Sequence, residues 1–253
     1  MEWQNFLSSG QIIYDQYQVE GTLGSGGFGD VYHVTDLDTG IDYALKVPFR
    51  GGLDTEITCL TQCNHPEFLP PLRFLEVDDH KAFTMELKGI SLQEYRFNVG
   101  GQLKIYNACL VAIKVLDHLE HLHDHGWIHR DIKPENILLG RNHEDKGLYL
   151  IDMSIACSYV NGHGRHLPFR FTHSNCGTQF YMSIRCHQNA SLSRRDDLES
   201  LAYMLVYLLK GELPWSYYDH QDYCLIKEGL SAEEICSGLP QLFVEFLLFE
   251  IER

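Results

Sequence analysis

The sequence has no long apolar run, no paired-cysteine motif and no excess of positive charge. No stretch reaches the ~18 consecutive apolar residues of a membrane-spanning helix, so we expect no membrane contact. The amino-terminal residues MEWQNFLSSGQ lack the basic and then apolar layout of a secretory signal. These absences indicate an intracellular protein of the cytoplasm or the nucleus.

The eight cysteines are scattered singly and none forms a C-x-x-C pair, so we expect reduced thiols rather than a disulfide framework. The formal net charge of −15 argues against general binding of nucleic acid, which is itself a polyanion. Several of the 14 histidines lie close together in HLHDHGWIHRD (121–131). No second cluster at zinc-ligand spacing accompanies this run, which favours positions on a helix surface and in a turn.

Apolar periodicity changes along the chain. YQVEGTLGSGGFGDVYHVTD (17–36) is typical of two strands joined by a glycine-rich turn, and IDYALKVPF (41–49) of a third strand. Residues 55–63 have helical spacing, and longer helical patterns cover residues 102–125 and 195–210. We therefore expect an α+β fold: a small β-rich lobe with one helix (residues 1–87) and a larger, mainly helical lobe (residues 88–253).

The glycine-rich turn has the pattern Gly24-x-Gly26-x-x-Gly29, whose backbone N–H groups can approach phosphates closely. It lies between two strands, which does not fit the dinucleotide fingerprint, and a simple hairpin turn has the same pattern. Lys46 lies among the apolar residues of the third strand, where it needs an anionic partner. Phosphates and the helical Glu56 are the expected partners.

The segment IHRDIKPENILL (128–139) is more specific. Asp131 and Asn136 are five residues apart in a loop that contains a proline, so a carboxylate can accept a hydroxyl proton and an amide oxygen can bind Mg²⁺. Lys133 can stabilise the charge of a transferred phosphoryl group. Asp152 follows the apolar run LYLI, 21 residues after Asp131, where a second metal ligand is expected.

These motifs together resemble the protein kinase family over residues ~17–248. MELKGISLQEY (85–95), GTQFYMSIRCH (177–187) and SRRDDLESLAYMLVYLLKGELPW (193–215) resemble the casein kinase 1 superfamily, which includes the vaccinia-related kinases. The lysine of HRDIKPEN is typical of Ser/Thr-specific members. The resemblance implies transfer of the ATP γ-phosphoryl group to Ser or Thr hydroxyls of a protein substrate.

The resemblance also implies a role for each matching residue. Asp131 would be the catalytic base and Lys133 the phosphate stabiliser, with a Lys46–Glu56 ion pair that positions ATP. Asn136 and Asp152 would bind Mg²⁺, or Mn²⁺ in its place, and Asp197 would anchor the catalytic loop. The ATP-binding residues would be Gly24, Gly26, Gly29, Val31, Ala44, Lys46, Met85 (gatekeeper), Glu86 and Leu87 (hinge) and Leu138.

The sequence departs from the family pattern in the metal-binding motif and in one spacing. Asp152-Met153-Ser154 replaces Asp-Phe-Gly or Asp-Tyr-Gly. Met153 can fill the apolar slot of the aromatic ring, whereas Ser154 lacks the free access of glycine to positive φ, at a cost of ~1 kcal/mol in some backbone states. We expect a restricted movement of Asp152 with catalysis retained. The 10-residue spacing from Lys46 to Glu56 is shorter than in most relatives.

The substrate class is less well defined. Phe180 follows Gly-Thr-Gln where many casein kinase 1 members have an anion-binding arginine, and together with the acidic net charge this disfavours acidic or prephosphorylated substrates. Arg185 and Lys227 are the remaining local positive charges, and each is typical of a solvated side chain. Thr178 is expected to form a structural hydrogen bond near the catalytic loop.

Two other functions stay open. One is a pseudokinase that binds nucleotide or a partner as a scaffold, which Ser154, the short Lys46–Glu56 spacing and the early end of the chain favour. The other is a small-molecule kinase, which would not need the segment 177–181 or SRRDDLES. The amphipathic LPQLFVEFLLFEIE (239–252) is expected to offer an apolar face to a partner.

Overall fold

The computed structural model describes residues 7–27, 29–48, 53–77, 80–172 and 176–251, which fall into two compact units. The first unit joins residues 1–89 with residues 139–154, and the second joins residues 90–138 with residues 155–253. This grouping differs from a simple division after residue 87, because the segment that carries Asp152 belongs with the first unit. Gly89 N donates to the Leu139 carbonyl at 2.8 Å, which ties the segment to that unit.

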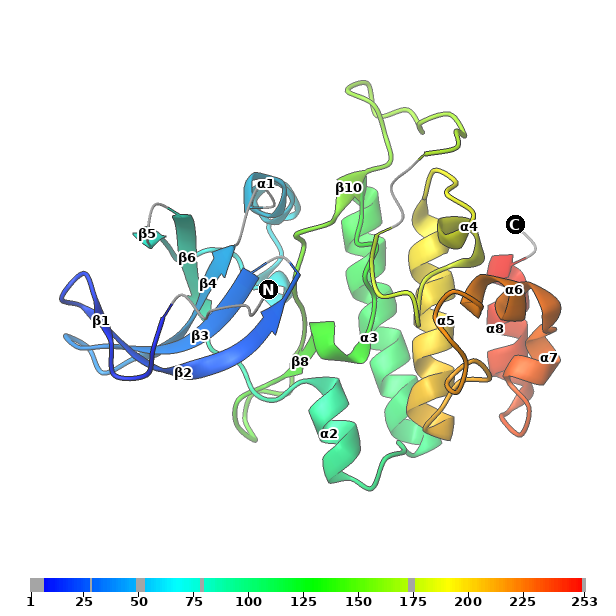
Figure 1. The fold of residues 1–253 in the computed structure, drawn as a ribbon, viewed down its shortest axis with the longest axis horizontal. Helices are drawn as coiled ribbons and strands as arrows, with labels where there is room; N and C mark the ends of the chain where they lie inside the picture. The colour runs from blue at the N-terminus through cyan, green and yellow to red at the C-terminus, as the bar shows by residue number, and fades with distance from the viewer. Residues whose placement is uncertain (1–6, 28, 49–52, 78–79, 173–175, 252–253) are drawn as a thin grey trace. The chain divides into compact units, whose positions relative to one another are not determined.

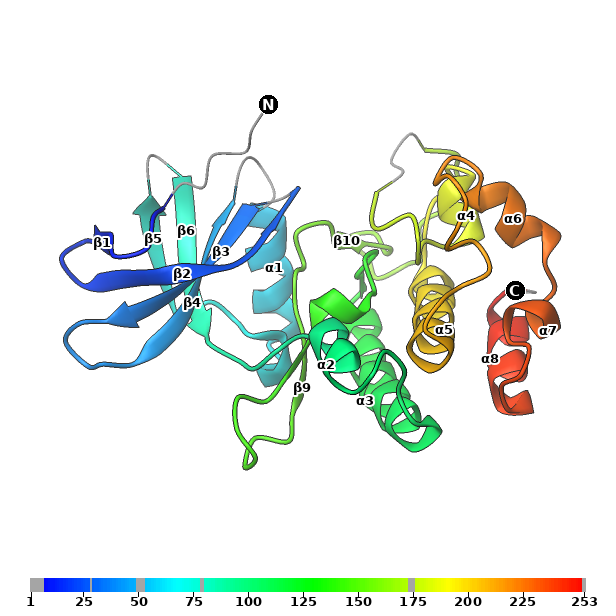
Figure 2. The ribbon, with the colours of Figure 1, turned by 60° about the horizontal axis from the view of Figure 1, so that its bottom comes forward.

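The first unit is built on a six-stranded antiparallel sheet (Figure 2). In spatial order its strands are β1 (Ile12–Ile13), β2 (Tyr17–Gly26), β3 (Gly29–Asp36), β4 (Asp42–Pro48), β6 (His80–Glu86) and β5 (Arg73–Val77). Helix α1 (Leu53–Cys63), the short 3₁₀ helix η1 (Pro66–Phe68) and strand β9 (Leu148–Leu150) complete it. The predicted strands and helix of this region are confirmed.

The two faces of this sheet differ, because successive side chains of a strand point to opposite sides. On one face, Val19, Tyr32, Val34 and Leu45 belong to the apolar core of the unit. Register places Val31 opposite Lys46 and Ala44 opposite Met85, so these four residues share the other face. The alternation therefore brings four of the predicted ATP-binding residues together.

The second unit is mainly helical. Its helices are α2 (Leu92–Asn98), α3 (Ile105–Asp124), η2 (Pro134–Asn136), α4 (Ile184–His187), α5 (Arg194–Lys210), α6 (Tyr223–Gly229), α7 (Ala232–Ile235) and α8 (Gln241–Ile251). Strands β7 (Trp127–Ile128) and β10 (Cys157–Ser158) pair with each other, and β8 (Ile137–Leu139) spans the boundary between the units. Both long helices predicted from the sequence are present.

Helix α5 forms the centre of the second unit, between α3 and α8 (Figure 1). Its side chains are buried along almost its whole length, and it ends at Gly211, whose φ of +87° is favourable only for glycine. Helix α8 buries Phe243 and Leu247 and leaves Leu242 exposed. A partner for that exposed face stays a prediction.

Within the described residues, no helix has the length and apolar character needed to cross a membrane. The first unit is a β-sheet with one α-helix and the second is mainly helical, so the predicted α+β class is confirmed.

Candidate functional site

Lys46, on β4, is buried and forms ion pairs with two carboxylates of the first unit. Its Nζ lies 2.7 Å from both carboxylate oxygens of Glu56 and 2.8 Å from Oδ1 of Asp152. Burial acts to lower the pKa of Lys46, but the charges of Glu56 and Asp152 outweigh it and hold that pKa above its ordinary value. The lysine is therefore a fixed positive charge on this face of the sheet.

The short spacing between Lys46 and Glu56 is explained by the start of α1. The helix begins at Leu53, so Glu56 lies in its first turn and faces into the unit. Burial raises the pKa of Glu56, and Asp152 adds to this effect while Lys46 opposes it. The predicted ion pair is present despite its spacing; its role in positioning ATP stays a prediction.

Asp152 has a left-handed backbone conformation with a φ of +68°. Ser154 Oγ donates to its Oδ1 at 2.6 Å, and Met153 N donates to Oε1 of Glu56 at 3.2 Å. The Met153 side chain is fully buried, as expected of a residue that fills the slot of an aromatic ring. Ser154 is not in a positive-φ conformation, so the serine has no backbone cost in this state, and Asp152 occupies the strained region instead.

The glycine hairpin connects β2 and β3, with Gly26 opposite Gly29. At Gly29 the φ is +149° and a Cβ would lie 2.5 Å from the carbonyl oxygen of Val47, so only glycine fits. At Gly24 and Gly26 a Cβ would meet no described atom within 4 Å. The hairpin thus has one glycine required by packing and two whose backbone stays open to a ligand.

The remaining predicted ATP-binding residues fall in both units. Met85 and Glu86 are the last two residues of β6, and Leu87 follows at the start of the connection to Gly89. Leu138 lies on β8 and belongs to the second unit. The hinge and adenine-contact roles of these residues stay predictions.

In the second unit, Asp131 is held on both carboxylate oxygens. Thr178 N donates to Oδ1 at 2.8 Å, and Lys133 Nζ lies 2.6 Å from Oδ2. Asn136 Nδ2 donates to the Asp131 carbonyl at 2.9 Å and to Oδ2 at 3.2 Å. The structure therefore brings together three predicted catalytic-loop residues, and Lys133 also donates to the hydroxyl of Thr178 at 2.9 Å. The hydrogen-bonding position predicted for Thr178 is confirmed.

Asp197, on α5, anchors the loop that carries Asp131, as predicted. Its Oδ2 accepts from His129 N at 2.9 Å, and its Oδ1 accepts from Arg130 N at 2.8 Å. Burial acts to raise the pKa of Asp197, but the hydrogen bond and charge of His123, together with these donors, lower it below its ordinary value. Arg130 has a φ of +73°, so the anchored backbone is strained directly before Asp131.

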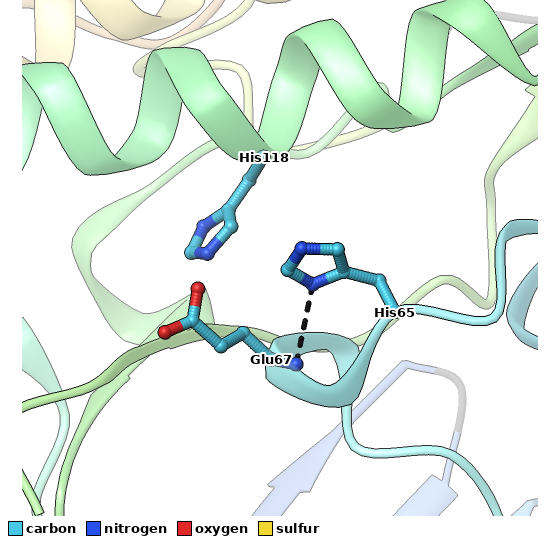
Figure 3. Close-up of side chains that lie close together, drawn as sticks. All are labelled: His65, Glu67 and His118. Carbon is cyan, nitrogen blue, oxygen red and sulfur yellow. Dashed lines mark hydrogen bonds between the residues drawn. The ribbon is translucent and has the colours of Figure 1, made fainter.

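Sequence reasoning missed the role of His123. The expectation of surface and turn histidines was wrong for His123 and His129, which are buried, and Nε2 of His123 lies 2.9 Å from Oδ2 of Asp197. The available signal was that His123 directly follows Leu122 on the buried side of α3. Other histidines also have local structural roles: His65 Nδ1 accepts from Glu67 N at 3.2 Å at the start of η1, as Figure 3 shows.

The chain was compared with known proteins. The protein kinase domain family matches residues 17–238. A protein named "Probable casein kinase I homolog" from Encephalitozoon cuniculi (strain GB-M1) is 34% identical over 246 residues, which covers 91% of this chain and 75% of the relative. Together with the ion pair on β4 and the anchored aspartate loop, these matches show that the chain belongs to the protein kinase family and is a Ser/Thr kinase of casein kinase I type.

Proposed function

We propose that this kinase is catalytically active, with Asp131 as the base and Mg²⁺ as the metal that accompanies ATP. The observation that carries this proposal is the arrangement around Asp131. Three donors, from Thr178, Asn136 and Lys133, fix both of its carboxylate oxygens within 3.2 Å. A base held in one orientation needs no reorganisation when a hydroxyl approaches.

The first unit is suited to binding the phosphates of ATP. Gly24 and Gly26 present backbone without side chains, and Lys46 is a buried cation with a raised pKa. Such a cation, already oriented by Glu56, can pair with the α- and β-phosphates at little further entropic cost. Val31, Ala44 and Met85 on the same face would meet the adenine ring.

The proposed metal ligands have suitable donor atoms. Mg²⁺ prefers carboxylate and amide oxygens, which Asp152 and Asn136 supply. Because Asn136 Nδ2 is used by Asp131, its amide oxygen is the atom directed away and suited to a cation. When bound, Mg²⁺ neutralises negative charge on the β- and γ-phosphates; Mn²⁺ has the same ligand preference and is the proposed alternative.

In the proposed reaction the oxygen of a Ser or Thr hydroxyl forms a bond to the γ-phosphorus while the bond to the bridging oxygen of ADP breaks. Asp131 accepts the hydroxyl proton, and Lys133 stays close to the reacting phosphoryl oxygens as a positive charge. ADP leaves with the electron pair of the broken bond. The residues of the chain thus supply proton acceptance, orientation and charge.

The substrate is proposed to be a protein whose recognition does not rest on an acidic or prephosphorylated site, because Phe180 replaces an anion-binding arginine. We propose the cytoplasm or the nucleus as the compartment, where the eight free cysteines would stay reduced. No nucleic acid or membrane ligand is part of this proposal. The exposed face of α8 is the proposed contact for a protein partner.

The proposal is tested by incubating the purified chain with γ-labelled ATP and dephosphorylated casein. The expected result is label on Ser and Thr but not on Tyr, dependent on Mg²⁺ or Mn²⁺ and abolished by a chelator. Transfer at background level, with ATP binding intact in a thermal-shift assay, would support the scaffold function instead. Transfer to small hydroxyl compounds but not to casein would support the small-molecule kinase.

A further inference from the structure

Lys227, on α6, is buried in the second unit. Its side chain has no exposed surface, so the expectation of a solvated positive charge at this position was wrong. A buried ammonium group is costly unless acceptors replace the water that it loses. The contacts of Lys227 therefore indicate what the group does.

The Nζ of Lys227 has three acceptors. It donates to the carbonyl of Met182 at 2.7 Å and to the carbonyl of Gln179 at 3.0 Å, and it lies 3.2 Å from Nε2 of His187. The protonated ammonium has three donors for these three groups, and the neutral amine still has two donors for the two carbonyls. The rings of Trp215 and Tyr203 lie under the same group, with centroids 4.8 Å and 5.0 Å away.

The pKa values of Lys227 and His187 are both lowered in this environment. Burial lowers the pKa of Lys227 to about 7, and the nearby Glu199 opposes that effect. Burial and the charge of Lys227 lower the pKa of His187 to about 4, so the imidazole is neutral near pH 7 and its Nε2 can accept a hydrogen bond. The two backbone carbonyls can therefore accept hydrogen bonds from Lys227 whether its amine is protonated or neutral.

Both carbonyls belong to the turn 179–182, which directly follows Thr178. Within this turn, Tyr181 N and Met182 N each donate to the Thr178 carbonyl, at 2.9 and 3.1 Å. Trp215 Nε1 donates to the Phe180 carbonyl at 2.9 Å. One end of the turn is bound to α6 and to Trp215, while Thr178 at the other end is bound to Asp131 and Lys133.

We propose that Lys227 is a positioning residue for the protein substrate: it fixes the turn 179–182 and, through Thr178, the place of a hydroxyl beside Asp131. This inference rests on the kinase activity of the chain and adds a residue that makes no contact with ATP or the reacting atoms. Loss of the lysine loosens one end of the turn while the side chains of the first unit stay as they are. Protein-substrate binding and the chemical step are therefore affected and ATP binding is not.

The test compares Lys227→Met, Lys227→Arg and Lys210→Met with the wild type. Methionine keeps the packing on Trp215 and removes the donors, whereas arginine restores donors. Lys210 is a matched control, because it too donates to a backbone carbonyl, that of Ile235 at 3.3 Å, but not to the turn. The measurements are the KM values for dephosphorylated casein and ATP, kcat, and hydrogen exchange of the amides of Tyr181 and Met182.

The expected result for Lys227→Met is an increase of at least about tenfold in the KM for casein or an equal loss of kcat, with the KM for ATP within about twofold of wild type. Exchange of the two amides accelerates about tenfold, Lys227→Arg recovers much of both effects, and Lys210→Met matches wild type. Wild-type casein kinetics and wild-type exchange in Lys227→Met would overturn the proposal, as would equal increases of both KM values.

Hydrogen exchange of the Tyr181 and Met182 amides does not need kinase activity, so it tests the role of Lys227 independently of the proposed function. If the wild type transfers no phosphate, the proposed function fails, and the exchange rates alone then decide the role of Lys227. Faster amide exchange in Lys227→Met than in Lys210→Met supports the proposal that Lys227 fixes the turn 179–182. Equal exchange in the two variants overturns it. If Lys227→Met does not fold, the same comparison is made with Lys227→Gln, whose shorter, uncharged side chain cannot reach all three groups and is expected to accelerate exchange of the turn amides and raise the KM for casein without changing the KM for ATP.

Discussion

The hydroxyl of Ser154 donates to Oδ1 of Asp152 at 2.6 Å, the same oxygen that lies 2.8 Å from Nζ of Lys46. The serine that replaces glycine in this motif therefore holds the proposed metal ligand in place. We expect Ser154→Ala to raise the Mg²⁺ concentration needed for half-maximal activity about tenfold, because groups that orient a metal ligand contribute on this scale. A titration of phosphate transfer against Mg²⁺ at fixed ATP measures this.

The control for that substitution is Ser154→Thr, which keeps the hydroxyl and is expected to keep the Mg²⁺ dependence of the wild type. Binding of Mn²⁺, followed by its paramagnetic signal, gives the same comparison without catalysis. An unchanged metal dependence in Ser154→Ala would show that Lys46 alone is enough to orient Asp152.

Lys46→Met leaves the buried carboxylate of Glu56 and the half-buried carboxylate of Asp152 without their cation. Removing one partner of a buried ion pair costs about 3–5 kcal/mol, so we expect a decrease of this size in the free energy of unfolding in urea. ATP binding is expected to be lost as well. Lys81→Met is the control, since Lys81 and Asp54 are 3.5 Å apart and exposed, and unfolding is expected to be unchanged. Equal stability of Lys46→Met and wild type would contradict the buried pair.

Two glycines of the hairpin are expected to respond differently to alanine. At Gly29 a Cβ would lie 2.5 Å from the Val47 carbonyl oxygen and the φ is +149°, so Gly29→Ala is expected to destabilise the protein by about 1–3 kcal/mol. At Gly24 the added Cβ meets nothing, so Gly24→Ala is expected to keep stability while raising the KM for ATP. Thermal unfolding and ATP kinetics of both variants test this. A Gly24→Ala variant less stable than Gly29→Ala would contradict the packing described for the hairpin.

Asp197 is expected to make stability depend on pH. Its folded-state pKa is lowered, so its stabilising contribution is complete above the ordinary carboxyl pKa of about 4 and is lost as pH falls through the folded-state value. The stability difference between wild type and Asp197→Asn should therefore be largest at neutral pH and should shrink below about pH 4. Urea unfolding between pH 3 and pH 7 measures this. A difference that stays constant over that range would contradict the lowered pKa.

The sequence predicted the strands and the loop around Asp131, because these depend on residues that are close together in the chain. The strands over residues 17–36 and 41–48 followed from local apolar patterns, and the loop around Asp131 followed from residue spacing within twelve positions. The roles of Val31 and Ala44 came only from the family resemblance, and the register shows that they share a face with Lys46. The Lys46–Glu56 pair forms despite its short spacing, with Glu56 in the first turn of α1.

What the sequence could not show depends on distant partners. The buried state of Lys227 requires the carbonyls of Gln179 and Met182, more than 40 residues earlier, and no local pattern marks a lysine on α6 as internal. His123 likewise is explained only by Asp197. The left-handed backbone of Asp152, whose side chain contacts Lys46 and Ser154, was also not predicted, because sequence reasoning considered a backbone cost only at Ser154.

The most direct test of the account is phosphate transfer from γ-labelled ATP to dephosphorylated casein by the wild type and by Asp131→Asn. Asparagine keeps the shape of the side chain but cannot accept the proton, so the account predicts a fall in kcat of at least about 100-fold with ATP binding unchanged. Equal rates in the two proteins, whether at background level or well above it, would contradict the assignment of Asp131 as the base of an active kinase.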